Sequence, residues 1–224
     1  MSRGRQKMTL RKFTREHPSR EDERRFREAM NSDSDLIVAI VSAIEVEYLL
    51  EQIIIGKLKR GDEDTIDLLT KDNGALSTFF SKIGLAYALN IIDGSKMEYL
   101  NVIRRIRNAF AHSRKDISFS NSLILDEMSS LKLPPQRHSK LYHGIKIVRE
   151  LATAKPNVDN STIAQLSLLG RAAYVILTMH LITYFLTKRK SSVSRLKRFR
   201  NSLGASGATM AAALMAYEKP PKKL

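Results

Sequence analysis

Two helix-forming segments separated by a very short break place the strongest constraint on the fold of this chain. Apolar residues recur at helical spacing over about residues 76–91 and again over about 95–112, and Asp93-Gly94 marks a turn between them. Helices joined by so few residues normally lie antiparallel and side by side. The spacing therefore predicts two neighbouring helices of an up-and-down bundle.

The rest of the chain repeats this helical pattern. A long helix is predicted from a cap at Ser34 or Asp35 to a stop at Gly61, and its apolar residues extend around much of its circumference. Further helices are predicted over about residues 121–131, 139–153 and 161–188. The acidic stretch "DEDTIDLLTKDNG" is interpreted as a solvated connection, and no alternating strand pattern is present. The predicted fold class is all-α, an up-and-down helical bundle with basic terminal arms.

The net charge of +15 is concentrated at the two ends of the chain. Residues 1–30 hold 10 Lys and Arg against 5 Asp and Glu, residues 188–224 hold 10 against 1, and residues 31–187 are nearly neutral. We therefore divide the chain into a basic N-terminal arm (1–34), a helical domain (35–188) and a basic tail with a short helix of small residues (189–224).

The basic arms have two open interpretations. They either solubilise the protein or hold RNA, DNA or an anionic membrane by non-specific charge attraction. The residues predicted to make such contacts lie at the start of the tail: Lys188, Arg189, Lys190, Arg195, Lys197, Arg198 and Arg200.

Composition also limits the chemistry and the location. The absence of cysteine excludes disulfides and thiolate sites and fits a reducing cytoplasm. The basic N-terminus lacks the apolar run of a secretory signal, so a cytoplasmic protein is predicted. The apolar run 172–187 is shorter than the roughly 20 residues that a membrane span needs, so a buried core helix is expected there. No cofactor and no metal site are predicted.

The segment "LNVIRRIRNAFAHS" carries a second, polar stripe on an otherwise core-facing helix. Its polar side holds five residues at 100° per residue: Asn101, Arg104, Arg105, Asn108 and His112. Arg107 flanks the apolar side, about 140° from His112 on a straight helix. The two residues therefore meet at one site only if the helix loosens near Ala111 or a second chain completes the site.

Three interpretations of this stripe remain open. It is the solvated polar side of a core or subunit-interface helix, a surface for docking a partner, or a metal-independent ribonuclease site. In the last case His112 would move a proton, Arg107 would stabilise the charged phosphorane and Asn108 would orient either. Asn101, Arg104 and Lys82 are predicted binding residues. Lys82 would join Arg104 at an anion site, although an exposed edge lysine is the commoner arrangement.

The middle of the chain resembles the mannitol operon repressor family. The resemblance rests on "LAYALNII", a one-turn spacer and "IRRIRNAFAH" in that order, preceded by "LIVAIVSAIEVEYLLEQII". It covers residues 36–130 well and 160–188 loosely. It implies an all-helical fold and a regulatory role in sugar-uptake genes. It also implies that repression is indirect, through a regulatory protein partner, because the family lacks a recognised DNA-binding domain.

"RNAFAH" also looks like the Arg-X4-6-His motif of HEPN domains, helical bundles that commonly dimerise. In ribonuclease members of that group the arginine, the following polar residue and the histidine face each other across the dimer. Carried over, these positions are Arg107, Asn108 and His112. This second resemblance implies a homodimer and, as the alternative function, a metal-independent endoribonuclease of toxin or defence type.

Overall fold

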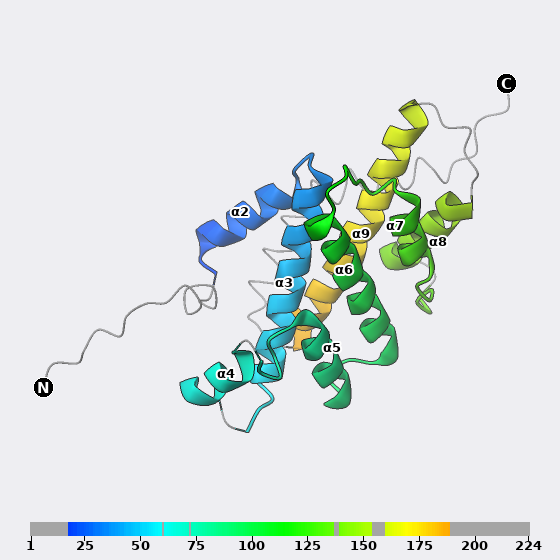
Figure 1. Cartoon of the computed structure of the whole chain (residues 1–224). Helices are drawn as coiled ribbons and strands as arrows, with labels where there is room; N and C mark the ends of the chain where they lie inside the picture. Colours follow the sequence, from blue (N-terminus) through cyan, green and yellow to red (C-terminus); the bar gives the residue numbers. More distant parts are fainter. Residues whose placement is uncertain (1–17, 60, 72, 137–138, 154–159, 189–224) are drawn as a thin grey trace, which may run out of the picture.

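The computed structural model describes residues 18–188 apart from residues 60, 72, 137–138 and 154–159 (Figure 1). Every regular element in these ranges is an α-helix, which confirms the predicted all-α fold class. The helices are α2 (Arg20–Met30), α3 (Asp35–Ile55), α4 (Glu63–Thr70), α5 (Phe79–Ala88), α6 (Gly94–His112), α7 (Ser122–Ser129), α8 (Lys140–Thr153) and α9 (Asn160–Lys188).

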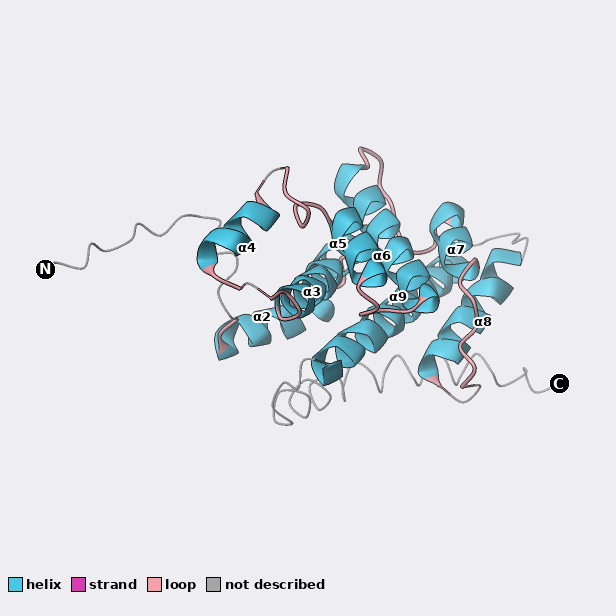
Figure 2. Ribbon diagram, turned by 90° about the horizontal axis from the view of Figure 1, so that it is seen from below, coloured by secondary structure: helices cyan, strands magenta, loops and turns pink. Residues whose placement is uncertain are grey.

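Helices α3 and α9 lie side by side at the centre of the bundle, and α6 packs against both with the opposite direction (Figure 1). Helix α5 packs against α3, while α7 lies beside α6 and α8 packs against α7 and α9. Figure 2 shows α2 and α4 at one edge of the molecule and α7 and α8 at the other. Helix α6 therefore borders α3 and α5 along one flank and α7 along the other.

The predicted short break between α5 and α6 is present, but its tight turn lies around Asn90 and not at Asp93-Gly94. Asn90 has a φ of 58°, in the left-handed region that asparagine tolerates better than most residues. The backbone N–H of Ile91 donates to the carbonyl oxygen of Ala86 at 2.9 Å, which closes the end of α5. Asp93 then caps α6 by accepting from the backbone N–H of Lys96. Helix α6 consequently begins within a few residues of the end of α5.

A cluster of three tilted aromatic rings ties α6 to α9 through the segment that follows α6. The Phe119 ring lies 5.0 Å from the Phe110 ring and 5.0 Å from the Tyr174 ring, between ring centroids. The Tyr174 hydroxyl donates to the carbonyl oxygen of Ala39 in α3 at 3.0 Å. Gly170 permits this close packing, since a Cβ there would stand 2.4 Å from the carbonyl oxygen of Phe119.

Asp35 joins three parts of the chain at the start of α3. Its carboxylate accepts from the Arg171 side chain at 2.6 Å, from the Ser167 hydroxyl at 3.0 Å and from the backbone N–H of Phe119 at 2.9 Å. Asp35 is 9% exposed, so these bonds lie largely out of water. Ser34 supplies the cap of α3, one of the two capping residues that the sequence predicted.

Three further details differ from the sequence-based expectations. Helix α3 ends at Ile55 with Gly56 as its C-cap, because Gly56 stops the helix before Gly61 is reached. The acidic connection contains α4, which Asp62 caps by accepting from the backbone N–H of Thr65. Ile44 is 57% exposed, because neighbouring helices cover less of the circumference of α3 than its apolar pattern indicated.

Helix α9 has the length and apolarity of a membrane span, yet it occupies the position of a core helix. In the apolar window of its segment Ile163–Lys188, 61% of the residues are buried inside the bundle. Its apolar side chains pack against α3 and α8. This arrangement agrees with the predicted core helix.

Candidate protein-binding surface

A group of charged side chains joins α3, α5 and α6 beneath the polar stripe. The Lys82 ammonium pairs with Glu47 at 2.7 Å and with Glu51 at 2.8 Å, and the Arg107 guanidinium pairs with Glu47 at 3.2 Å. The Lys82 side chain is 9% exposed, whereas the Arg107 side chain is 28% exposed. Lys82 is therefore a buried ion-pair partner and not an exposed edge lysine. Its predicted role as an anion-binding residue stays a prediction.

Arg104 is the cation of this region that has no carboxylate partner among the described residues. Its guanidinium lies over the Phe80 ring, 5.2 Å from the ring centroid, and its Nε is buried without a hydrogen-bond acceptor. Desolvation lowers the pKa of Arg104, and the neighbouring charges of Arg105 and Arg107 lower it further. Unmet hydrogen-bonding capacity and like charges nearby both favour the approach of an anionic group.

Exposed aromatic rings accompany Arg104 on the adjacent helix. Phe80 is 63% exposed and Tyr87 is 48% exposed, and they are seven residues apart on α5, which places them on the same side of the helix. Gly84 lies between them, and a Cβ at that position would meet nothing within 4 Å. We call the surface formed by Phe80, Tyr87 and Arg104 the α5–α6 face. Aromatic and arginine side chains are the types that contribute most to protein-protein binding.

The outer ridge of α6 carries the remaining residues of the predicted stripe. The Asn101 side chain donates to the Met97 carbonyl oxygen at 3.0 Å, one turn back along the helix. Asn108 is half-buried and His112 is exposed, and neither side chain makes a hydrogen bond or an ion pair with another described residue. Both side chains are thus available to a ligand or to a second protein.

Helix α6 is continuous through His112, so it does not loosen near Ala111. Arg107 points toward Glu47 of α3, while His112 lies exposed in the last turn of α6. A single chain therefore does not bring the two residues to one site. The predicted dimer and the predicted ribonuclease arrangement stay predictions.

Of the basic tail residues predicted to contact nucleic acid, Lys188 is the one that the structure describes. It is exposed, and its ammonium lies 5.5 Å from the centroid of the Tyr184 ring. Six others lie outside the described residues: Arg189, Lys190, Arg195, Lys197, Arg198 and Arg200.

Comparison with known proteins supports the fold. No family model and no curated protein sequence matches this chain. Among solved structures, the X-ray structure of the MtlR–HPr complex from Escherichia coli matches with a TM-score of 0.50 and 17% sequence identity. The match covers 73% of this chain and 97% of the matched chain. The chain shares the fold of MtlR, the mannitol repressor. This agrees with the all-helical fold that the sequence resemblance implied.

Sequence reasoning missed the carboxylates that organise this region. Glu47 occurs among apolar residues on one face of the first long helix, and an acidic residue in such a position signals a buried ion pair. The partners Lys82 and Arg107 lie 35 and 60 residues away, so the pairing itself needed the structure. The sequence does not indicate that Phe80 is exposed. It follows Phe79, which is buried, and only the rotation of α5 about its axis decides which of the two rings faces the solvent.

Proposed function

We propose that this protein is a regulator of the mannitol-repressor type, which acts on carbohydrate-uptake genes indirectly by binding a regulatory protein through the α5–α6 face. The observation that carries the proposal is Arg104, a partly desolvated cation without a carboxylate partner, set beside an exposed aromatic ring. The shared fold adds support, since the MtlR structure is that of a complex with the protein HPr.

Charge indicates what kind of partner surface would fit. Lys82 and Arg107 are balanced by Glu47 and Glu51, so Arg104 leaves the α5–α6 face with an excess positive charge. A carboxylate from the partner would pair with Arg104, while apolar side chains of the partner cover Phe80 and Tyr87. Charge of this kind accelerates association and fixes orientation, and the aromatic rings supply the buried area.

The direct test is calorimetric titration of the full-length protein with HPr from the same organism. We expect binding by the wild type and at least about a tenfold loss of affinity in Arg104→Gln and Phe80→Ala, as for central interface residues. Arg105→Gln is the matched control, because Arg105 is the next residue of α6 yet pairs with Glu127 of α7 at 2.7 Å. Its affinity should stay close to that of the wild type.

A cellular experiment tests the regulatory part of the proposal. Deleting the gene should change the transcripts of carbohydrate-uptake genes, and reintroducing the Arg104→Gln variant should fail to restore them. Unchanged transcripts together with no binding to HPr would contradict the proposal. Loss of binding in the Arg105→Gln control as well would contradict the assignment of the α5–α6 face.

The alternative is a metal-independent HEPN-like endoribonuclease that uses Arg107, Asn108 and His112. The exposed position of His112 and the absence of a described partner for Asn108 favour this candidate. Incubating RNA with the protein in EDTA, beside Arg107→Ala and His112→Ala, decides it. Cleavage that both substitutions abolish supports the enzyme, whereas intact RNA with the wild type argues for the regulator.

A further inference from the structure

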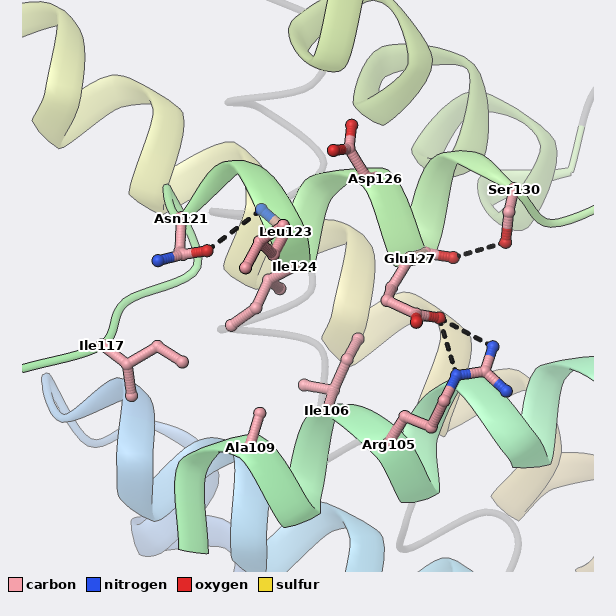
Figure 3. Close-up of a pocket in the computed structure, with 10 residues that line it drawn as sticks. All are labelled: Arg105, Ile106, Ala109, Ile117, Asn121, Leu123, Ile124, Asp126, Glu127 and Ser130. Atoms are coloured by element: carbon pink, nitrogen blue, oxygen red, sulfur yellow. Dashed lines mark hydrogen bonds and ion pairs between the residues drawn. The ribbon is translucent and has the colours of Figure 1, made fainter. Parts of the chain in front are cut away.

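A groove runs between α6 and α7 on the flank of α6 that faces away from the α5–α6 face (Figure 3). Its volume is about 690 Å³, and apolar side chains from α6, the following loop and α7 form its floor and walls: Ile106, Ala109, Ile117, Leu123 and Ile124. Leu123 is 72% exposed, so the groove leaves apolar surface in water. The Arg105–Glu127 ion pair closes one end, as the dashed lines in Figure 3 show.

The two flanks of α6 carry opposite charge. On the groove side Arg105 is already paired with Glu127, and Asp126 makes no ion pair with a described residue. Glu98 lines a smaller pocket of about 170 Å³ that continues the groove beyond Arg105, but Lys132 pairs with it at 3.2 Å, so Asp126 is the excess charge of this flank. On the other flank Arg104 is the excess charge. A basic segment is therefore attracted to the groove and repelled by the α5–α6 face.

The last part of this chain has the matching chemistry. In "LGASGATMAAALMAY", residues 203–217, four large apolar side chains recur at helical spacing and fall within about 60° of one another: Leu203, Met210, Leu214 and Tyr217. Most of the remaining residues of the segment are Ala, Gly or Ser, which allow a close approach to another helix. Ten basic and one acidic residue occur in 188–224, so the segment is tethered by strongly basic sequence.

The chain is long enough for this segment to reach the groove. Helix α9 ends at Lys188, and the Tyr184 hydroxyl one turn earlier donates to the Ile91 carbonyl oxygen at 2.9 Å, near the start of α6. Ala109 lies about 20 Å further along α6, at 1.5 Å per residue. Residues 189–202 can span roughly 46 Å when extended.

We propose that residues 203–217 dock into the α6–α7 groove of their own chain as an amphipathic helix. Met210 and Leu214 enter between Ile106 and Leu123, while the basic residues that precede the segment lie near Asp126. A helix of this length is marginal in water by itself, so it forms through packing against the groove. This mode matches the general recognition of amphipathic helices by apolar grooves.

The absence of cysteine makes the test direct, because one introduced cysteine is the only labelling site. Ala212 lies opposite the apolar side of the segment, so a nitroxide on Ala212→Cys of the full-length protein leaves that side free. We expect the label to broaden the methyl NMR signals of Ile106, Leu123 and Ile124. The signals of Leu68 in α4, an exposed leucine elsewhere on the molecule, should keep their intensity.

Two further samples make the result decisive. Adding Leu214→Glu to the labelled chain should return the groove signals to the intensity of the reduced, diamagnetic sample, while circular dichroism shows that the bundle is intact. Unbroadened groove signals in the labelled wild-type sequence would overturn the proposal. Equal broadening in a mixture of spin-labelled chains with separate isotope-labelled chains would also overturn it, because the occupant would then be a second copy.

Discussion

Replacing Lys82 by methionine separates a structural role for this lysine from a binding role. The Lys82 ammonium contacts Glu47 at 2.7 Å and Glu51 at 2.8 Å, and the side chains of Lys82 and Glu51 are 9% and 10% exposed. Methionine has a similar length but no charge, so the variant leaves two largely buried carboxylates without this cation. Removing one partner of a buried ion pair lowers the free energy of unfolding by about 3–5 kcal/mol.

The lower end of that range applies here. Glu47 is 20% exposed and keeps the Arg107 guanidinium at 3.2 Å, so part of the lost charge is still compensated. We expect Lys82→Met to lower the free energy of unfolding by about 3 kcal/mol. With a urea m-value of about 2 kcal/mol/M, the unfolding midpoint followed by circular dichroism would fall by about 1.5 M.

Lys132→Met is the matched control. Lys132 pairs with Glu98 at 3.2 Å but is 76% exposed, so its loss should cost less than about 1 kcal/mol. A loss below about 1 kcal/mol for Lys82→Met as well would refute the structural assignment. If that variant were also stable but unable to bind an anionic partner, the predicted anion-binding role of Lys82 would stand instead.

Three further predictions follow from the packing. Gly170→Ala should lower the free energy of unfolding in urea by about 1–3 kcal/mol, because the new Cβ would lie 2.4 Å from the Phe119 carbonyl oxygen. Gly144→Ala is its control and should be neutral or slightly stabilising, because no atom would lie nearer than 3.6 Å to its Cβ. Asp35→Asn should cost about 3 kcal/mol in the same assay, since Arg171 loses its buried carboxylate. Desolvation, with a smaller contribution from Lys96, lowers the pKa of His180. The free energy of unfolding should therefore rise with pH between the folded-state pKa of His180 and about 6.5. Imidazole-proton NMR of the wild type and His180→Gln would measure that pKa.

Periodicity predicted the helices well because they are strongly patterned and well capped. The expected segment 95–112 corresponds to α6 at Gly94–His112, and the expected 139–153 to α8 at Lys140–Thr153. The prediction of helices failed where the apolar periodicity of the sequence was weak. Helix α4 was missed because its eight residues carry too few apolar side chains to show a face, and Asp62 was read as part of a solvated acidic run when it is a helix cap.

The candidate site was predictable only along its own helix. Spacing at 100° per residue correctly placed Asn108 and His112 on the outer side of α6 and Arg107 toward the apolar side. Spacing does not say which helix covers each flank. The pairing of Arg107 with Glu47, the cation–π contact of Arg104 with Phe80 and the groove beside Arg105 all depend on contacts between distant segments.

Glu47 provides a way to decide between the two proposed functions. A catalytic Arg107 must bind the reacting phosphate, yet in this structure its guanidinium pairs with Glu47 at 3.2 Å, so the carboxylate competes with the substrate. Glu47→Gln removes that competitor with almost no change of shape. If the protein is a ribonuclease, cleavage of RNA in EDTA should therefore increase in this variant while Arg107→Ala abolishes it.

If Arg107 is structural, Glu47→Gln should lower the urea midpoint, because Lys82 and Arg107 both lose a carboxylate partner, and RNA should remain intact. Reduced cleavage at unchanged stability would contradict the competition argument.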